Sequence, residues 1–453
     1  MNAADNPLVR VVVLSFDGGQ MTIDCLDSLL ASDWPADRLE IVLVDNGSLD
    51  DVAQRVRADY PQVRLLEPLE NLGFAGGCNL GMQLPGEHRY VALVNNDATV
   101  DPGWLRPLVE AAESAPDVGA VSAKMLFADR YLGIEVEVPD AATINRSDPR
   151  PLGVRISAVR IDGARADRRL SFDEDFYGPE LPNSDYDEEI ARWSRATGSL
   201  RIAIDPDQPL PQIVSLRLSS PEPRTVTLTT EAEQQTLPIG AERTWYDIRL
   251  GDEPFDVINN VGSNLYRGGF GGDRGFLERD LGQYEEPAEV FAWCGGAVLL
   301  RRGYLDEVGH FDEHLFLYYE DTDLSWRGRL RGWRYLYEPR SVVRHRHAAS
   351  SGVGSPTFRF YTERNRLLVL AKNAPTALAL RAGLGEVRRF VRTTVSAYIV
   401  RPLKLQMPER HESAHRRRVC KSYVQLLPTM LRDRRHTPPT ADRAAMMRWE
   451  VTK

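Results

Sequence analysis

Three carboxylates stand within four residues of one aromatic-rich segment. The segment runs Phe316-Leu-Tyr-Tyr-Glu-Asp-Thr-Asp-Leu324 and contains Glu320, Asp321 and Asp323. Like charges so close together raise each other's pKa, and neighbouring aromatic walls add a desolvation cost for the charged form. A carboxylate in this setting can act as a general base. The alternative is a solvated acidic turn, which the flanking aromatic side chains disfavour.

Two further carboxylates follow apolar runs of strand length. Asp45 ends the run EIVLVD, and Asp97 comes two residues after the run YVALVN. At the end of a parallel strand, a carboxylate such as Asp45 can accept the imide N–H of a uracil or thymine base. Asp97 at a neighbouring strand end can hold a divalent cation beside phosphates. Each residue also fits a plain turn or a helix cap.

Two other segments have ligand-binding chemistry. The segment Asn71-Leu-Gly-Phe-Ala-Gly-Gly-Cys-Asn79 places three glycines before a predicted helix, which allows close backbone approach to a phosphate or ribose. It matches neither a dinucleotide fingerprint nor a Walker A loop, and a tight turn is the alternative. The segment Arg344-His-Arg-His347 offers imidazoles to a metal and guanidinium groups to phosphates, or is a basic surface loop.

The elements that must position these residues alternate in type over the first 125 residues. Helical spacing separates apolar runs of strand length, and this alternation predicts a parallel sheet with helices on both faces and ligands at the carboxyl ends of its strands. The predicted strands are Val9–Ser15, Glu40–Asp45, Val63–Glu67 and Tyr90–Asn95.

The periodicity of apolar residues changes near Tyr131, and the earlier pattern returns near Phe255. Between these residues, helical periodicity is absent and short alternating segments recur, which predicts an inserted β-sandwich. Mixed α/β character then returns, with Gly262–Gly275 predicted to be a loop. Beyond Thr357 the pattern is helical, with a break at Pro375.

Composition bounds the class of protein. With 453 residues, the chain is long enough for two or three domains, and 42% hydrophobic and 27% charged residues are typical of a soluble protein. We find no secretory signal, no run of about 18 apolar residues and no C-x-x-C pair among the four cysteines. The prediction is a cytoplasmic protein without a disulfide framework.

The net charge of −9 is unevenly distributed. From Arg381 to Arg435 there are fourteen Lys or Arg against four Asp or Glu, so this stretch carries +10 and the remainder −19. An acidic body disfavours non-specific nucleic-acid binding. The basic, amphipathic tail predicts a helix at an anionic membrane surface, on the inner face of the plasma membrane. Packing of the same face on the catalytic domain or on a second subunit is the alternative.

Together and in this order, the segments resemble family 2 glycosyltransferases of the GT-A fold, and among them bacterial cell-envelope rhamnosyl- and galactofuranosyl-transferases. The resemblance covers about 1–130 and 257–375. It is carried by Ser15-Phe-Asp-Gly, Cys25-Leu-Asp-Ser-Leu29, Val44-Asp-Asn-Gly-Ser48, Asn71–Gly81, Asn95-Asn-Asp97, Trp293-Cys-Gly-Gly-Ala297, Val308-Gly-His-Phe-Asp312, Tyr319-Glu-Asp-Thr-Asp-Leu324, Gly332-Trp333, His345 and Arg364-Asn-Arg366.

The resemblance implies the GT-A part of the fold, and the insert and the basic tail, which lie outside it, are predicted from their own sequence patterns. The expected fold class is α/β: a GT-A (Rossmann-like) mixed sheet with helices on both faces, an inserted β-sandwich and a C-terminal helical segment. The expected parts are a nucleotide-sugar-binding half (1–130), the inserted β-sandwich (131–256), an acceptor and catalytic half (257–375) and a basic helical region (376–453).

The resemblance also implies roles residue by residue. Asp321 is the expected catalytic base, with Glu320 beside it, and Asp97 and His345 are the expected ligands of Mg²⁺ or Mn²⁺. Asn95 replaces the first acid of a full DxD motif, which leaves fewer charged ligands for the metal. The expected donor-binding residues are Ser15, Asp17, Asp45, Asn71, Gly73, Phe74, Asn79 and Asn96. The expected acceptor-side residues are Trp293, Gly295, Asp323 and Arg364.

The implied activity is an inverting transfer of a sugar from a nucleotide-diphosphate donor, dTDP- or UDP-linked, to a glycan or polyprenyl-linked glycan in cell-envelope polysaccharide synthesis. Asp321 would deprotonate the acceptor hydroxyl as it attacks the anomeric carbon from the opposite face. One alternative is a non-catalytic carbohydrate-binding protein that uses the β-rich insert. Another is a nucleotidyltransferase, but Phe16-Asp-Gly-Gly-Gln20 lacks the basic residue that its phosphate loop would need. A homo-oligomer is a further possibility.

Overall fold

A computed structural model describes residues 6–145, 148–173, 175–180, 191–206, 208–346, 355–404, 407, 410–438 and 442–452. The chain divides into two compact units. The first comprises Met1–Ala128, Ile258–Phe276 and Gly282–Lys453. The second comprises Asp129–Val257 and Leu277–Leu281. The predicted insert, 131–256, falls inside the second unit.

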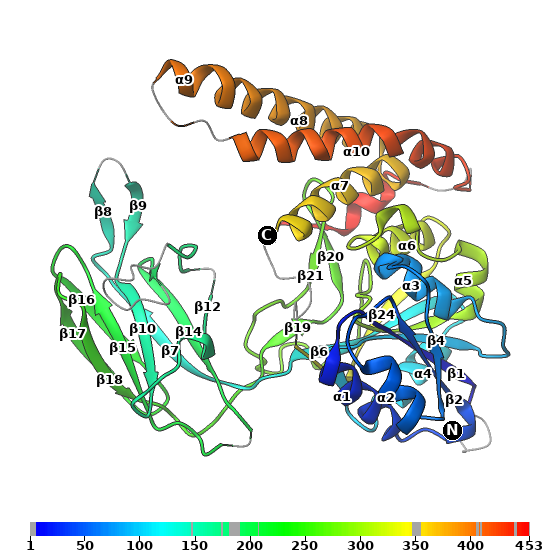
Figure 1. Cartoon of the computed structure of the whole chain (residues 1–453), viewed down its shortest axis with the longest axis horizontal. Coiled ribbons are helices and arrows are strands. Elements are labelled where there is room, and N and C mark those ends of the chain that lie inside the picture. The colour runs from blue at the N-terminus through cyan, green and yellow to red at the C-terminus, as the bar shows by residue number, and fades with distance from the viewer. Residues whose placement is uncertain are drawn as a thin grey trace. The chain divides into compact units, whose positions relative to one another are not determined.

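The first unit is built on a ten-stranded mixed sheet in the order β22-β24-β6-β23-β4-β1-β2-β3, with β19 beside β6 and β5 beside β24 (Figure 1). Strands β1 to β4 are parallel to one another, whereas β23 runs antiparallel between β4 and β6. The strands are β1 (Val9–Ser15), β2 (Leu39–Asp45), β3 (Val63–Leu66), β4 (Tyr90–Asn95), β5 (Ala98–Val100), β6 (Val118–Phe127), β19 (Ile258–Asn260), β22 (Ala288–Glu289), β23 (Ala297–Arg301) and β24 (Arg334–His345).

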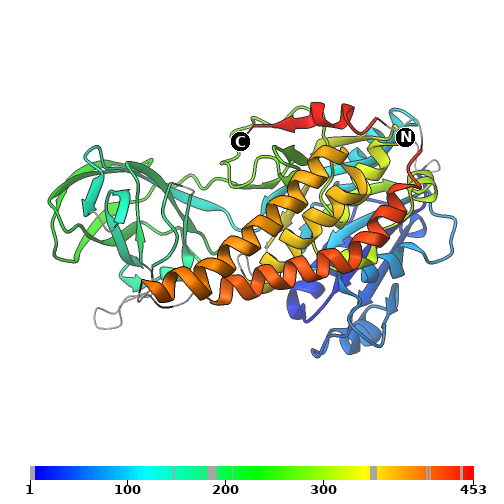
Figure 2. The same ribbon diagram turned by 90° about the horizontal axis from the view of Figure 1, so that it is seen from above.

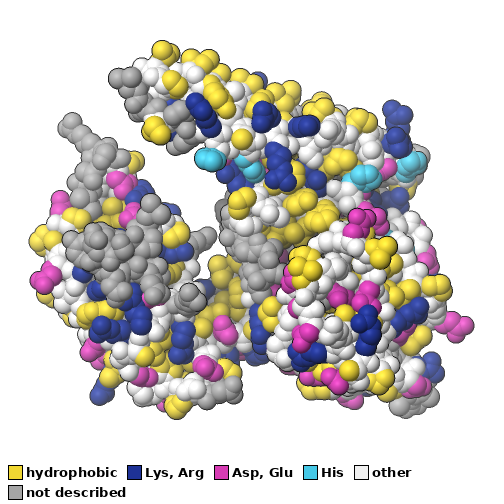
Figure 3. Space-filling model, in the orientation of Figure 1, with side chains coloured by type: hydrophobic (Ala, Val, Ile, Leu, Met, Phe, Trp, Pro, Cys, Tyr) yellow, Lys and Arg dark blue, Asp and Glu magenta, His cyan; other side chains and the backbone are white. Residues whose placement is uncertain are grey.

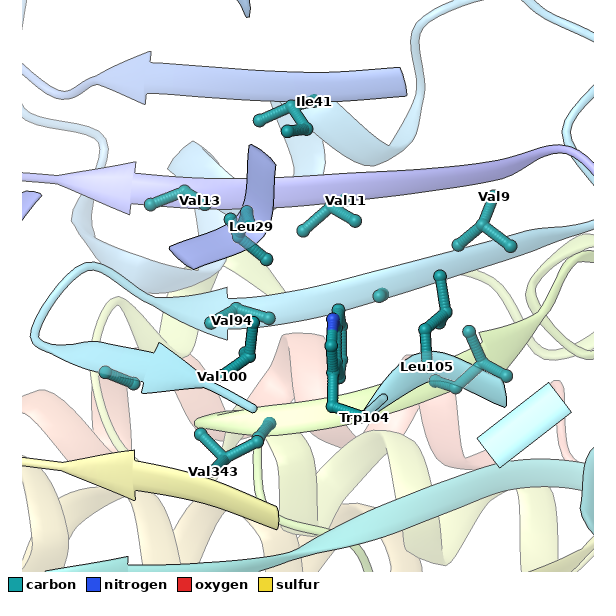
Figure 4. Packing of buried hydrophobic residues seen from close by; sticks show 14 of the residues in the cluster. Val9, Val11, Val13, Leu29, Ile41, Val94, Val100, Trp104, Leu105 and Val343 are labelled. Atoms are coloured by element: carbon teal, nitrogen blue, oxygen red, sulfur yellow. The ribbon is translucent and has the colours of Figure 1, made fainter. Parts of the chain in front are cut away.

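Both faces of this sheet are buried. In β1, Val11 and Val13 enter one apolar cluster, while Val12, between them, enters the other. Figure 4 shows the first cluster, where Trp104 lies among valines of the strands and Leu29. The covering helices are α1 (Gly19–Leu30), α2 (Val52–Asp59), α3 (Gly73–Met82), α4 (Leu105–Glu113), α5 (Arg302–Val308) and α6 (Glu320–Arg329). The predicted α/β sheet with helices on both faces is confirmed.

The prediction of a loop over Gly262–Gly275 is wrong. The segment forms a hairpin of β20 (Ser263–Tyr266) and β21 (Phe270–Asp273), and β25 (Glu450–Val451) extends it. The turn uses Gly268 and Gly269, whose φ angles of 85° and 74° suit glycine. The glycines inside β21 hid the strand from sequence reasoning, because glycine has low strand propensity.

The second unit is a β-sandwich with an apolar core between two five-stranded sheets. The sheets have the orders β11-β10-β15-β18, with β13 beside β10, and β12-β14-β7-β16-β17; β8 and β9 pair separately. The strands are β7 (Tyr131–Glu137), β8 (Ala142–Asn145), β9 (Asp148–Leu152), β10 (Arg155–Ile161), β11 (Ala164–Arg165), β12 (Leu170–Phe172), β13 (Arg192–Trp193), β14 (Thr197–Ala203), β15 (Ile213–Ser219), β16 (Arg224–Thr229), β17 (Gln234–Ile239) and β18 (Thr244–Arg249). The predicted inserted β-sandwich is confirmed.

The C-terminal segment is helical, as predicted. Helices α7, α8 and α10 lie side by side in both ribbon views (Figures 1 and 2), and the chain turns at Pro375. The elements are α7 (Pro356–Asn373), α8 (Thr376–Val395), a π-helical turn (Ser396–Val400), α9 (Arg401–Leu403) and α10 (Arg410–Arg434). In the described part of the chain, no helix has both the length and the apolar character needed to cross a membrane.

Candidate active site

The carboxyl ends of β1, β2 and β4 bring several of the predicted donor-side residues to one edge of the sheet. Ser15 and Asn96 both hydrogen-bond to Thr22, since the Thr22 hydroxyl lies 2.9 Å from Ser15 Oγ and accepts from Asn96 Nδ2 at 3.0 Å. Asp45, only 6% exposed, accepts a hydrogen bond from the Ser48 N–H at 3.2 Å. Parallel strands place such residues together because their ends share one edge.

Asp17 lies outside this buried group. It is exposed, has a φ of 50°, and its Oδ1 accepts the Leu49 N–H at 2.7 Å. The Ser48 hydroxyl accepts the Asp17 N–H at 3.0 Å. These bonds join the loop after β1 to the loop after β2.

Asn46 orders the glycine loop, and sequence reasoning did not select it. Its Oδ1 accepts the Leu72 N–H, and its Nδ2 donates to Asn71 Oδ1 and to the Gly73 carbonyl. Gly73 has a φ of 70°, and a Cβ there would lie 2.5 Å from Phe316. The residue must therefore be glycine, both for its backbone conformation and because the segment before α6 packs directly against it.

Phe74 and Asn79, two predicted donor residues on α3, face the second half of the unit. The Asn79 amide bonds both backbone groups of Phe311, its Oδ1 accepting the N–H and its Nδ2 donating to the carbonyl, each at 3.0 Å. Asn79 is 3% exposed. Its burial and these bonds indicate that it attaches α3 to the loop that contains Phe311, and they disfavour contact with a donor. The Phe74 ring packs on Phe311 and lies against Gly295.

The two expected metal ligands are in contact. His345 Nε2 lies 2.9 Å from Asp97 Oδ1 and 3.2 Å from Asn95 Nδ2. On the other side of the ring, Nδ1 lies 3.0 Å from Asn259 Oδ1. Because Asn259 presents an acceptor, an Nδ1–H would donate to it, and Nε2 would then direct its lone pair toward the Asp97 carboxylate.

This pair fits a divalent cation. Two acceptor atoms 2.9 Å apart require a proton or a cation between them, and the Asn259 bond is the outer contact that metal-binding histidines usually have. Across the described residues, no group of three or more His, Cys, Asp or Glu side chains is arranged to hold a metal. The described residues therefore offer two ligands, Asp97 and His345, and the remaining positions would fall to phosphate oxygens and water. His347 lies outside the described residues.

The acidic cluster opens α6. Asp321 Oδ2 accepts the Gly295 N–H at 3.3 Å, and Oδ1 accepts the Thr322 N–H at 2.6 Å. Glu320 is 6% exposed, and its Oε2 has no hydrogen-bond partner in the described part of the chain. Burial raises the pKa of Glu320 well above its usual value, and the adjacent Asp321 charge raises it further. Burial also raises the pKa of Asp321, against the lowering effect of its hydrogen bonds.

Asp323 differs from its two neighbours because both of its oxygens are bound to nearby side chains. Arg327 Nε (2.8 Å) and Lys372 Nζ (3.1 Å) donate to Oδ2, and Asn373 Nδ2 (2.7 Å) donates to Oδ1. The carboxylate is fully buried. This arrangement favours anchoring α6 to α7 over contact with an acceptor.

Arg364 and Asn365 on α7 hold the loop before α6. Asn365 Nδ2 lies within 2.9 Å of the carbonyl oxygens of Leu315, Leu317 and Tyr318, and Arg364 donates to the His314 and Leu315 carbonyls. The loop needs this support, because Phe316, Tyr318 and Tyr319 have φ angles of 65°, 68° and 71°. Such backbone angles cost about 1–3 kcal/mol each and persist only where the surroundings enforce them.

Of the other predicted acceptor-side residues, Gly295 reaches the cluster and Trp293 lies in the core. The Gly295 N–H donates to Asp321, as described above. Trp293 is fully buried, and its ring packs on Phe311 at 6.0 Å between centroids.

A continuous set of contacts links the two acidic groups. Asp321 accepts from the Gly295 N–H, and the next residue, Gly296, accepts the Asn95 N–H at 2.9 Å through its carbonyl. Asn95 Nδ2 in turn contacts His345, which contacts Asp97. A carboxyl group of raised pKa thus stands near a pair that fits a cation. Such a site can accept a proton while charge develops on a phosphate nearby.

Sequence reasoning missed Asn46, Asn259, Asp273 and Asn365. Three are asparagines that bind backbone or imidazole groups, and only the neighbouring motifs hinted at them: Asn46 lies inside Val44–Ser48 and Asn365 inside Arg364–Arg366. Asn259 lies in β19, a strand that was not predicted from the sequence, and Asp273 lies in β21, inside the segment Gly262–Gly275 that was predicted to be a loop.

Residues 10–134 match the model of glycosyl transferase family 2. Over 69 residues the chain is 44% identical to an N-acetylglucosaminyl-diphospho-decaprenol L-rhamnosyltransferase of Mycobacterium tuberculosis, covering 15% of this chain and 22% of that protein. Over 110 residues it is 32% identical to the succinoglycan biosynthesis protein ExoO of Rhizobium meliloti, covering 24% and 31%. The chain therefore spans about a fifth to a third of the length of these relatives.

Two solved structures align with the chain at low sequence identity. The structure of GalNAc-T7 with UDP, GalNAc and Mn²⁺ aligns with a TM-score of 0.43 at 12% identity, over 96% of this chain and 58% of that one. The mannosyltransferase PcManGT of Pyrobaculum calidifontis, in complex with GDP-Man and Mn²⁺, aligns with a TM-score of 0.40 at 14% identity, over 94% and 88%.

Proposed function

We propose that the chain is an inverting glycosyltransferase. The proposal starts from the match of residues 10–134 to the model of glycosyl transferase family 2. The enzyme transfers a sugar from a dTDP- or UDP-linked donor to a glycan or polyprenyl-linked glycan of the bacterial cell envelope. The observation that carries this proposal is the set of contacts from Asp321 through Gly295, Gly296 and Asn95 to the His345–Asp97 pair. It joins a candidate base to a candidate diphosphate site.

Each part of the site has a role in this reaction. The Asp321 carboxylate takes the proton of the acceptor hydroxyl as that oxygen attacks the anomeric carbon, and its raised pKa makes it a stronger base than an ordinary aspartate. Glu320 stands beside it, and burial together with the Asp321 charge raises the pKa of Glu320 well above its usual value. One displacement of this kind inverts the anomeric configuration.

The donor side uses the edge formed by β1, β2 and β4. Asp45 accepts the imide N–H of the base, and the loop ordered by Asn46 brings the backbone at Gly73 close to the donor. Asp97 and His345 would hold Mg²⁺ or Mn²⁺, which supplies charge stabilisation for the departing diphosphate when bound.

The acceptor class follows from the relative that the chain resembles over 69 residues, whose name specifies a decaprenol-linked N-acetylglucosaminyl diphosphate. We extend to this chain only the class, a polyprenyl-linked sugar. Domains follow the same proposal: 1–130 for the donor, 257–375 for the acceptor and catalysis, 131–256 for recognition, and 376–453 for contact with the membrane.

The test is a panel of donors and acceptors. dTDP-, UDP- and GDP-sugars are incubated with Mg²⁺, Mn²⁺ or chelator, first alone and then with a short-chain polyprenyl diphospho-N-acetylglucosamine or methyl glycosides. Metal-dependent donor hydrolysis and transfer with inversion are the expected results. Retention of configuration, or the absence of both hydrolysis and transfer with every donor, would overturn the proposal.

The surface through which we propose that the chain contacts the membrane lies on α8 and the turns that follow it. Side chains at helical spacing expose an apolar face there, with 41–80% of each side chain accessible, formed by Leu380, Leu384, Val387, Val391, Val395, Tyr398, Ile399 and Leu403. Figure 3 shows hydrophobic side chains along this edge, with Lys or Arg beside them. Val387, Val391 and Arg388 line a hollow of about 440 Å³ in this face.

The arginines make an anionic lipid surface the occupant that fits this face best. Arg381, Arg388 and Arg392 are exposed, and none has an ion pair with a described residue. Each basic residue close to an anionic membrane contributes about 1 kcal/mol, and the apolar side chains would enter the interface between headgroups and acyl chains. A basic face would repel a second copy of itself in a symmetric dimer.

Sedimentation with vesicles of phosphatidylglycerol and phosphatidylcholine tests this surface. We expect retention on anionic vesicles that is lost in Leu384→Glu/Val391→Glu, and lost in high salt. Val424→Glu, which changes a 61% exposed side chain on α10, is the matched control. If the double variant instead abolishes self-association measured by light scattering and leaves vesicle retention intact, the face is an interface between copies and the membrane assignment is wrong.

A further inference from the structure

The β20–β21 hairpin carries a carboxylate, Asp273, that the proposed mechanism does not use. The hairpin packs against the segment that contains the candidate base, Asp321. The Gly271 N–H donates to the Tyr319 hydroxyl at 3.4 Å, and a Cβ at Gly271 would lie 3.1 Å from Thr322 Oγ1. Residues two apart on a strand share a face, so Asp273 is on the face of β21 that meets the start of α6.

A second contact fixes Asp273 relative to His345. Asn260 Nδ2 donates to Asp273 Oδ1 at 2.6 Å, and Asn260 Oδ1 accepts the Gly262 N–H at 2.8 Å. The preceding residue, Asn259, bonds His345 Nδ1. Two successive residues of β19 therefore hold a carboxylate and an imidazole, and Asp321 and His345 are both close enough to Asp273 to act on its charge.

The remaining acceptor capacity of Asp273 is unused. Its Oδ2 receives no hydrogen bond from the described residues, and none of their Lys or Arg side chains pairs with it. The side chain is nevertheless only partly exposed. Desolvation is the main cause that raises the pKa of Asp273 to about 6, and the nearby Asp321 charge adds to it. A partly desolvated carboxyl without a cation is costly to retain unless a ligand completes its bonds.

We infer that Asp273 is a substrate-contacting residue, whose Oδ2 accepts a hydrogen bond from a hydroxyl of the acceptor sugar beside the one that reacts. Carboxylates suit this contact because a charged acceptor strengthens a hydrogen bond to a neutral hydroxyl. The inference rests on the proposed function. It gives the acceptor side a specificity residue on a different element from the base.

The experiment compares Asp273→Asn, Asp273→Ala and Phe270→Ala in the intact chain. Asparagine retains an oxygen for the Asn260 bond and removes the charge. Phe270 lies on the opposite face of the same strand and is 48% exposed, so it controls for damage to the hairpin. Donor hydrolysis and transfer are measured with the donor and acceptor that the wild-type chain uses best, together with the melting temperature Tm.

For Asp273→Asn we expect the acceptor KM to rise about tenfold, the value of one charged hydrogen bond, with donor hydrolysis within twofold of wild type. Asp273→Ala should raise KM at least as much, and Phe270→Ala should leave it unchanged. An unchanged acceptor KM in Asp273→Asn, or an equal rise in Phe270→Ala, would overturn the assignment of Asp273 alone. Absence of transfer by the wild-type chain with every acceptor would instead overturn the proposed function, and this inference with it.

Discussion

The two compact units differ in their buried carboxylates, because the first combines compensated ones, such as Asp323, with uncompensated ones. In the β-sandwich, Asp167 accepts the Val159 N–H at 2.6 Å and pairs with Arg165, so its charge is compensated. Among the described residues of the first unit, Glu320 Oε2 has no hydrogen-bond partner, and Glu320 and Asp321 are adjacent residues with raised pKa values. Uncompensated buried charge lowers stability, and proteins usually retain it where a ligand or a reaction requires it.

The contrast extends to the basic side chains. In the first unit, Arg327 and Lys372 lie in a buried network around Asp323 that braces α6. In the sandwich, Arg160 and Arg217 stack on the Trp245 ring, at 4.2 and 5.5 Å from its centroid. The first unit thus concentrates strain and charge at one sheet edge, whereas the second forms an ordinary apolar core. This difference predicts that chemistry belongs to the first unit alone.

Replacing the candidate base should have the largest effect. We expect Asp321→Asn to lower kcat by about 10²–10⁴-fold, the usual share of a general base, while donor affinity stays nearly unchanged. Turnover and donor binding by calorimetry check this result. If the variant keeps more than about a tenth of wild-type turnover, another group is the base.

The same variant separates function from stability. Burial raises the native pKa of Asp321 above its unfolded value, so its contribution to stability is present at low pH and is lost as the pH rises through the native pKa. At neutral pH the buried charge is therefore destabilising, and Asp321→Asn should raise Tm. The acid limb of the kcat profile should lie above 3.8, the ordinary Asp pKa. A lowered Tm would show that Asp321 stabilises the fold and would weaken the contrast between the units.

Loss of the cation pair should rank second. Chelation should remove donor hydrolysis, and Asp97→Ala should weaken diphosphate binding more than nucleoside binding. Asn259→Ala, which removes the bond to His345 Nδ1, should cost about 10–100-fold in metal affinity, as outer contacts of metal ligands usually do. Full activity in excess chelator would contradict the metal role. Because the described residues supply only Asp97 and His345, we expect dialysis to remove the metal readily.

Removing the bonds from Asn365 to the loop before α6, which we call the loop clamp, should give a smaller effect. Asn365→Leu keeps the side-chain volume but removes the bonds to three backbone carbonyls of a loop with three left-handed residues. We expect a destabilisation of about 2–4 kcal/mol from the lost bonds and a fall in kcat of about tenfold from misplacement of Asp321. A lowered Tm with unchanged kcat per folded molecule would show that the clamp serves the fold and not the site.

Whether a feature of the fold or of the candidate site could be predicted from the sequence depends on the kind of sequence pattern that it leaves. Val9–Ser15 and Tyr90–Asn95 are mostly apolar runs of strand length, so their strands were predicted with the bounds that the structure shows. Pro375 marked the break between α7 and α8 because proline cannot continue a helix. Asp97 and His345 were predicted as partners from the resemblance, although they are far apart in the chain, and they are in contact.

Other features depended on tertiary contacts that no local pattern encodes. The glycines at 271 and 272 are typical of a loop, yet they lie in β21, where a Cβ would be 3.1 Å from Thr322 Oγ1 and 2.8 Å from the Tyr266 ring. Asp323 has the same residue type as Asp321 and lies two positions away, but only its position beside Lys372 and Asn373 shows that it is braced. Asn365 acts on a loop some fifty residues earlier, and its three acceptors are backbone carbonyls, which carry no sequence signal.

The smallest effect is expected from the sandwich, and it tests the contrast most directly. Expressed alone, residues 129–257 should fold cooperatively with a β-type circular dichroism spectrum, because their core is made by their own strands.

In the full chain, Arg160→Ala and Trp245→Ala, which dismantle the stacked pair on the outer face of one sheet, should leave donor hydrolysis within about twofold of wild type. Any change should appear in transfer to large acceptors, since recognition of an extended glycan is the role proposed for this unit. A disordered spectrum of the isolated segment would show that the sandwich depends on the first unit. Loss of donor hydrolysis in either variant would show that the sandwich takes part in donor chemistry, and the division between a chemical unit and an ordinary one would fail.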